Sequence, residues 1–192
     1  MIKTTKVHKF IDKLINKYIM RKRRCVLPKS KFEQLSDIVK QYADVAREHY
    51  DYKPGNDLID VFKKENFIIE FIKEYSKIDG EIIIDPNNNF RKLTISTFGG
   101  MNRFRFTLAH ELGHFIIHSQ WGNNPYESFR DENKNINEKI ANMFAAYFLM
   151  PEKEVRKLVE KKYPIEYIAN YFGVSVLAMK YQLENLKLNE SY

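Results

Sequence analysis

The chain has 192 residues, of which 44% are hydrophobic and 30% charged, a composition typical of a globular protein with one main domain. Its single cysteine excludes an internal disulfide and a cysteine-based zinc site, and no apolar run is long enough to span a bilayer. The net charge of +7 comes from the N-terminus: residues 1–31 carry eleven Lys/Arg and one acid, whereas the rest carries 21 basic and 24 acidic residues.

Residues 1–31 are predicted to form a basic amphipathic arm. Apolar side chains recur at helical spacing from Val7 to Ile19, with lysines on the other faces, and Arg-Lys-Arg-Arg follows at 21–24. Such an arm can bind DNA, an anionic surface or an acidic partner, or pack its apolar stripe on the rest of the protein. It lacks the apolar region and cleavage site of a secretory signal, so we expect a cytoplasmic protein.

The residue pattern after the arm predicts a mixture of helices and short strands. Three Ile-rich segments are bounded by Gly, Pro and Asn, and the Asp-Pro-Asn-Asn-Asn sequence is typical of a turn between two of them. The predicted elements in chain order are a helix at 30–49, a short helix at 58–65, strands at 66–72, 80–86 and 92–97, a helix at 106–118, a loop at 119–137, a helix at 138–150 that Pro151 ends, and two or three helical pieces over 152–192.

The segment His110-Glu111-Leu112-Gly113-His114 matches the HExxH pattern. On a helix, the two histidines lie one turn apart on the same face, so both imidazoles can reach one ion. Glu111 lies about 100° round the helix, where its carboxylate can act as the catalytic base on a water at the metal. The alternative is an apolar helix whose histidines are satisfied by other partners.

A third metal ligand is available in Glu138, which begins the next predicted helix, with Asn142 one turn further on. Two imidazoles and a carboxylate with an open position suit zinc, with manganese as the alternative metal. For His118 we expect a role other than ligand, as a second-shell partner, a transition-state donor or a surface residue. Tyr126 and Tyr147 are candidates for stabilising an oxyanion, against the alternative that they are loop and core residues.

Two segments together resemble the ImmA/IrrE family of metallopeptidases: RFRFTLAHELGHFIIH at 103–118 and NEKIANMFAAYFLMP at 137–151. The similarity runs from about Asp57 to Pro151 and does not include the arm. It implies an α+β, gluzincin-like fold in which a short sheet packs on the two active-site helices. It also implies a cytoplasmic, site-specific endopeptidase that cuts a helix-turn-helix repressor and so releases mobile-element, prophage or stress genes.

Carried over by position, the resemblance assigns the metal ligands to His110, His114 and Glu138 and the catalytic base to Glu111. We further expect the strand at 92–97, just before the motif, to be a sheet edge to which an extended substrate segment can add. The resulting domain organisation is an arm at 1–31, a zinc metallopeptidase domain at 32–155 and a helical, helix-turn-helix-like module at 156–192.

The C-terminal segment 164–186 has the spacing of a helix-turn-helix, but its composition argues against DNA binding. The first positions of its second helix are Val176 and Leu177, which cannot read base edges by hydrogen bonding. Residues 163–192 carry only two Lys and three Glu. We therefore expect a module that packs on the catalytic domain or contacts the substrate protein, and direct DNA binding is not favoured.

Three functions fit these observations. The first is a zinc endopeptidase that relieves repression by cutting a regulator. The second is a DNA- or protein-binding regulator with a structural or vestigial metal site, and the third is a toxin-like protein controlled by a partner. Glu111 favours an enzyme over a structural site, because a structural zinc site needs neither a base nor an open position.

Overall fold

The computed structural model describes residues 29–73, 78–127 and 134–188. The predicted arm lies outside these residues except for its last three, and its interpretation stays a prediction. The elements are α2 (Lys29–Tyr50), α3 (Ile59–Lys64), β1 (Ile68–Ile72), β2 (Gly80–Asp85), β3 (Phe90–Ser96), α4 (Met101–Gly113), the π-helix η1 (His114–His118), β4 (Tyr126–Glu127), α5 (Lys134–Leu149), α6 (Glu152–Glu160), α7 (Ile165–Phe172) and α8 (Val176–Asn185).

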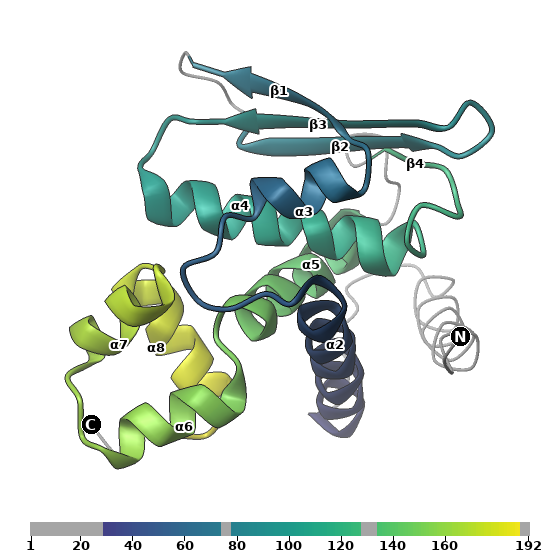
Figure 1. Cartoon of the computed structure of the whole chain (residues 1–192). Coiled ribbons are helices and arrows are strands. Elements are labelled where there is room, and N and C mark those ends of the chain that lie inside the picture. Colours follow the sequence, from purple (N-terminus) through teal and green to yellow (C-terminus); the bar gives the residue numbers. More distant parts are fainter. Residues whose placement is uncertain (1–28, 74–77, 128–133, 189–192) are drawn as a thin grey trace.

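The predicted α+β class is confirmed, with a four-stranded sheet lying against α3 and α4 (Figure 1). Among the described residues, no helix combines the length and the apolarity that a membrane crossing requires. The domain boundaries predicted from the sequence stay predictions.

The strand order β1-β3-β2-β4 corrects one expectation. The segment 92–97 was predicted to be a sheet edge, but β3 pairs with β1 in parallel and with β2 antiparallel, so it is an interior strand. Leu93 and Ile95 of β3 are fully buried. An added substrate strand therefore cannot pair with β3; within the described part of the chain, the edges of this sheet are β1 and β4.

The two helices that carry the candidate ligands, α4 and α5, approach each other closely at Gly113. A Cβ atom at this position would lie 3.2 Å from the Cα of Ala141 and 3.2 Å from the Cβ of Phe144. Contacts this tight leave little room for any side chain, so glycine permits the approach. The contact brings Glu138, one turn before Ala141 on α5, towards the histidines of α4.

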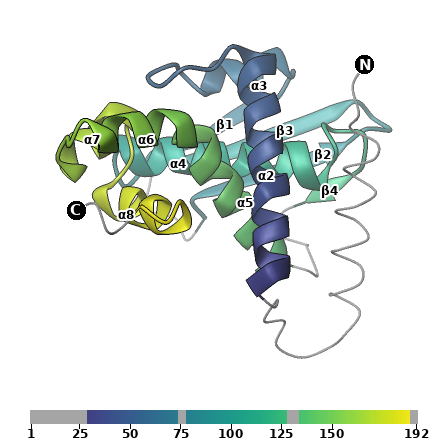
Figure 2. The same cartoon turned by 90° about the horizontal axis from the view of Figure 1, so that it is seen from below.

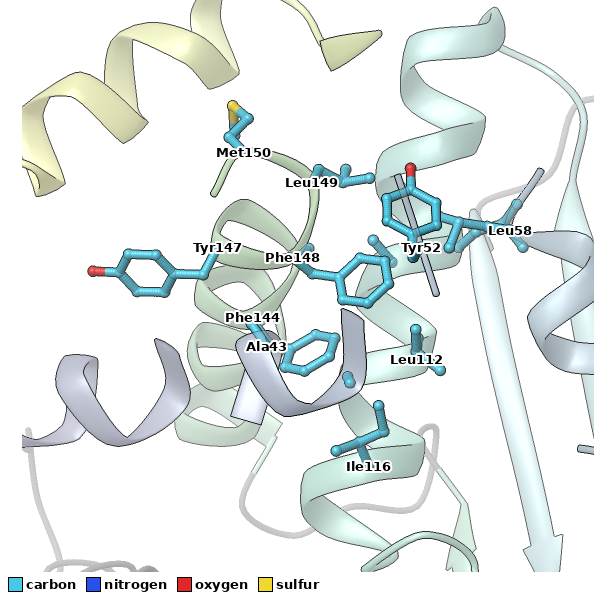
Figure 3. Close-up of a cluster of buried hydrophobic side chains, with 14 of the residues drawn as sticks. Ala43, Tyr52, Leu58, Leu112, Ile116, Phe144, Tyr147, Phe148, Leu149 and Met150 are labelled. Carbon is cyan, nitrogen blue, oxygen red and sulfur yellow. The ribbon is translucent and has the colours of Figure 1, made fainter. Parts of the chain in front are cut away.

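A cluster of buried aromatic and aliphatic side chains fixes α5 against the rest of the protein (Figure 3). Phe144 and Phe148 stack with ring centroids 5.5 Å apart, and Tyr52 lies 4.6 Å from Phe148. Leu112 and Ile116 complete this face of the cluster, and both are fully buried. Burial of this apolar area is the main stabilisation of the pair of site-bearing helices.

Helix α2 crosses α5 on the side away from the sheet (Figure 2). The Arg47 guanidinium donates to the carbonyl of Tyr147 at 2.6 Å, and the hydroxyls of Ser36 and Tyr147 are 2.6 Å apart. These bonds tie α2 to the C-terminal half of α5.

The C-terminal helices pack on the site-bearing helices at two points. The buried side-chain amide of Gln182 on α8 donates to the carbonyl of Met150 at 2.9 Å. The amide of Asn102 on α4 donates to the carbonyl of Val174 at 3.2 Å, in the turn between α7 and α8. That turn begins at Gly173, whose φ of 62° is the left-handed conformation that glycine ends helices with.

Candidate metal centre

The histidine-bearing segment is one continuous helical path, α4 followed by the π-helix η1. The amide of Ser119 donates to the carbonyl of His114, five residues earlier, at 3.0 Å. The sequence predicted a regular helix through 118 and gave no sign of the wider turn. Such π-turns occur frequently at functional sites. Here the π-turn begins at one candidate ligand, His114, and ends at His118.

The structure brings together His110, His114 and Glu138, the three predicted metal ligands. One ligand atom from each lies within 4.8 Å of the others. The Nε2 atoms of the two histidines are 3.0 Å apart. Glu138 Oε2 lies 3.2 Å from Nε2 of His110, and Glu138 Oε1 lies 3.6 Å from Nε2 of His114. Hydrogen bonds from the two imidazoles hold the pKa of Glu138 well below its usual range. The carboxylate is therefore charged and faces both rings.

The other ring nitrogen of each histidine has an oxygen partner. His110 Nδ1 lies 2.9 Å from the amide oxygen of Asn142, and His114 Nδ1 lies 2.8 Å from the hydroxyl of Tyr126. An oxygen partner at Nδ1 fixes the orientation of each ring, and it can accept the Nδ1 proton when Nε2 gives up its own to bind a metal ion. Both imidazoles are thus oriented with their Nε2 atoms towards Glu138.

Glu111 lies beside this cluster as a buried carboxyl group, with an exposed fraction of 3%. Burial raises its pKa to about 7. Among the described residues, its Oε2 has no hydrogen-bond partner. Buried carboxylate oxygens usually accept a hydrogen bond, and a water on a metal ion at the cluster would be a donor for this one. Two imidazoles and a second carboxylate beside this group fit a metal site with room for a water.

Gly80, at the start of β2, gives the Glu111 side chain its room. A Cβ at Gly80 would lie 2.6 Å from Thr107 Cγ2 and 2.8 Å from Glu111 Oε1. Sequence reasoning missed this contact, since the two residues are 31 positions apart and Gly80 looked only like the boundary of a strand.

His118 and Tyr126 form a stacked layer behind His114. The Tyr126 ring stacks on His114 and on His118, with centroids 5.3 and 5.6 Å away. His118 Nε2 donates to the carbonyl of Asn137 at 3.3 Å, and burial lowers its pKa to about 3. His118 is therefore neutral and contacts the Asn137 carbonyl, and its role as something other than a ligand stays a prediction.

Tyr147 is the predicted site residue that the structure does not bring to the cluster. Its hydroxyl is hydrogen-bonded to Ser36 on α2. Its ring points to the side of α5 opposite Phe148, as Figure 3 shows. Tyr147 follows Glu138 by nine residues, or two and a half helical turns, so helical spacing places its side chain on the opposite face of α5.

Comparison with known proteins supports the interpretation of these residues. Residues 91–184 match the M78 peptidase family model, described as the IrrE N-terminal-like domain. No curated protein matches the chain by sequence. Among solved structures, a Mycobacterium tuberculosis transcriptional regulator is similar with a TM-score of 0.55 and 16% identity, over 80% of this chain and 51% of that chain.

At 16% identity the structural likeness shows the fold alone, and this chain spans about half the length of that regulator. The family match is more specific, since it contains the HExxH segment, Glu138 and the helices on which they lie. Residues 91–184 are therefore an IrrE N-terminal-like domain of the M78 peptidase family, which supports the resemblance to the ImmA/IrrE metallopeptidases.

Proposed function

We propose that the protein is a zinc-dependent, site-specific endopeptidase that cleaves a helix-turn-helix transcriptional repressor. One observation carries the catalytic part of the proposal: the convergence of His110, His114 and Glu138 within 4.8 Å, with the buried carboxyl of Glu111 beside them. The repressor as substrate is what the family resemblance implies.

In the proposed site, the Nε2 atoms of His110 and His114 and the carboxylate of Glu138 hold the metal. Zinc is favoured over manganese, because imidazole-rich three-ligand sites are typical of catalytic zinc. When bound, zinc supplies Lewis-acid activation of a water and polarisation of the scissile carbonyl. Asn142 and Tyr126 keep the two imidazoles in the metal-binding tautomer and orientation.

Glu111 accepts a proton from the attacking water and returns it to the departing amine nitrogen. A pKa near neutrality suits both halves of this transfer, because the group is ready to take a proton and equally ready to release it. The alternative of a structural or vestigial metal site gives this buried carboxyl no function. An ionised carboxyl that is buried without a function would only lower the stability of the fold.

We do not propose direct DNA binding. The exposed side chains on α8 include Leu177 and Tyr181, with exposed fractions of 60% and 58%. Two apolar or aromatic side chains at these positions supply neither phosphate neutralisation nor bidentate hydrogen bonds to base edges. They are better suited to contact with a protein.

The experiment is incubation of the zinc-loaded protein with purified helix-turn-helix repressors, followed by mass spectrometry of the products. We expect cleavage of one repressor at a single bond and no cleavage by the Glu111→Gln variant carrying the same amount of zinc. Equal cleavage by both forms would show that another protease is responsible.

A further inference from the structure

A cavity of about 810 Å³ lies between α4, α5 and α8. Figure 1 shows α7 and α8 beneath the N-terminal end of α4. Its surface is mainly apolar, and the side chains that provide this surface are Phe106, Met143, Ala146, Leu177, Ala178 and Tyr181. A volume of this size accommodates several side chains of a bound segment.

The cavity lies next to the candidate metal centre, and Asn142 connects the two. Asn142 lines the cavity and is also the hydrogen-bond partner of His110. Phe106 lies one turn before His110 on α4, and Met143 lies just over one turn after Glu138 on α5. A segment bound in the cavity would therefore lie close to the three candidate ligands.

The wall formed by α8 is fixed in place and yet presents exposed apolar side chains. Gln182 and Asn102 make the bonds to Met150 and Val174 that hold the module against α5 and α4. Leu177 and Tyr181 line the cavity and remain 60% and 58% exposed. Exposed apolar side chains that line a preformed cavity are typical of a recognition surface.

The charge at the cavity wall is positive. Lys139, the residue after Glu138, is exposed and forms no hydrogen bond or ion pair within the part of the chain that the structure describes. The other cationic wall residue, Arg103, is paired with Asp79. An acidic group on a bound segment would complement Lys139.

We propose that this cavity binds the segment of the protein substrate next to the scissile bond, through a bulky apolar side chain and an acidic side chain that pairs with Lys139. Helix α8 is then a substrate-binding helix and not a DNA-reading one. This inference rests on the proposed peptidase function, since closeness to the metal centre is what gives the bound segment its place beside the scissile bond.

The test uses the zinc-loaded Glu111→Gln protein, which should bind peptides without cutting them, and a synthetic library of short random peptides. Bound peptides are recovered and sequenced by mass spectrometry. We expect enrichment of Leu, Met or Phe at one position and of Asp or Glu at a position near it. No enrichment would overturn the proposal.

Further substitutions in the same background locate the binding. Leu177→Asp should lower the apolar enrichment at least about tenfold, because it places a charge where an apolar side chain is held. Ala178→Phe, which fills the cavity instead of charging it, provides a second variant if Leu177→Asp fails to fold. Lys139→Glu should replace the enriched acidic residues by Lys or Arg.

The matched control is Tyr167→Ala on α7, which removes an aromatic side chain that is 49% exposed and does not line the cavity. It should leave the enrichment unchanged. Enrichment that survives Leu177→Asp and Ala178→Phe, or that the control alters equally, would contradict the proposal. So would a dimer that disappears with Leu177→Asp, since the cavity would then be an interface between two copies.

The wild-type protein separates failure of this inference from failure of the proposed function. If it cleaves peptides whose selection is unaffected by the cavity variants, the peptidase function stands and the inference fails. If the expected enrichment appears but zinc-loaded wild type cleaves none of the enriched peptides, the cavity is a binding site and the proposed function fails. Zinc content and thermal unfolding of each variant verify that its site and fold are intact.

Discussion

Replacing Glu111 by Gln should stabilise the metal-free protein at pH 8 and change its stability little at pH 5. The Glu111 carboxyl is 3% exposed, and burial raises its pKa from the ordinary 4.5 to about 7. Ionisation of this group is therefore harder in the folded protein than in the unfolded chain. The neutral amide of Gln occupies similar space and carries no charge at any pH.

The size of the effect follows from linkage between protonation and folding. A group whose pKa is raised by folding contributes its full stability below the unfolded pKa and loses it as the pH rises through the folded pKa. For Glu111 this window runs from 4.5 to about 7. Each pH unit in this window lowers the free energy of unfolding of the wild type by about 1.4 kcal/mol, which amounts to about 3 kcal/mol over the whole window. Glu111→Gln has no carboxyl group at this position and does not lose this stability.

The assay is urea unfolding of both proteins after removal of metal with a chelator, at pH 5 and pH 8. The control is Glu160→Gln at the exposed end of α6, which removes a carboxylate far from the cluster in sequence. We expect Glu111→Gln to gain about 3 kcal/mol over wild type at pH 8 only. The reasoning is refuted if the two proteins are equally stable at pH 8, or if the same difference appears at both pH values.

Three further predictions concern the site and its support. Gly80→Ala should lower the kcat for peptide cleavage about tenfold without loss of zinc, because its Cβ would displace the Glu111 carboxylate; steady-state kinetics and elemental analysis measure the two effects. Tyr126→Phe should weaken zinc binding about tenfold, because it removes the oxygen partner of His114 Nδ1; competition with a chelating dye measures the affinity. Phe148→Ala should lower the free energy of unfolding by about 3–5 kcal/mol in urea titrations, because the ring is fully buried.

The features that could be predicted from the sequence are those set by local spacing. The Ile-rich segments became β1, β2 and β3, and the residues of the HExxH segment lie on one helical path because a four-residue interval is one helical turn. Glu138 was identifiable because a carboxylate at the start of the following helix was the available third donor. The structure places it within reach of both histidines.

The features that could not be predicted depend on contacts between distant segments. The interior position of β3 results from parallel pairing with β1, and no local pattern indicates which strand will pair in parallel. The bond from Tyr126 to His114 starts in a segment without apolar periodicity, and that segment contains β4. Helix α5 also begins at Lys134 and not at 138, since its first turn contains a single apolar residue, Ile136, which is too little for a helical period.

The central claim is that His110, His114 and Glu138 form one metal site with Glu111 as its base. Elemental analysis of the purified wild type, Glu138→Ala and Glu111→Gln tests it most directly. We expect one zinc per chain in the wild type and in Glu111→Gln, with marked loss in Glu138→Ala. Absence of metal from the wild type even after zinc is added, or full zinc content in Glu138→Ala, would contradict it.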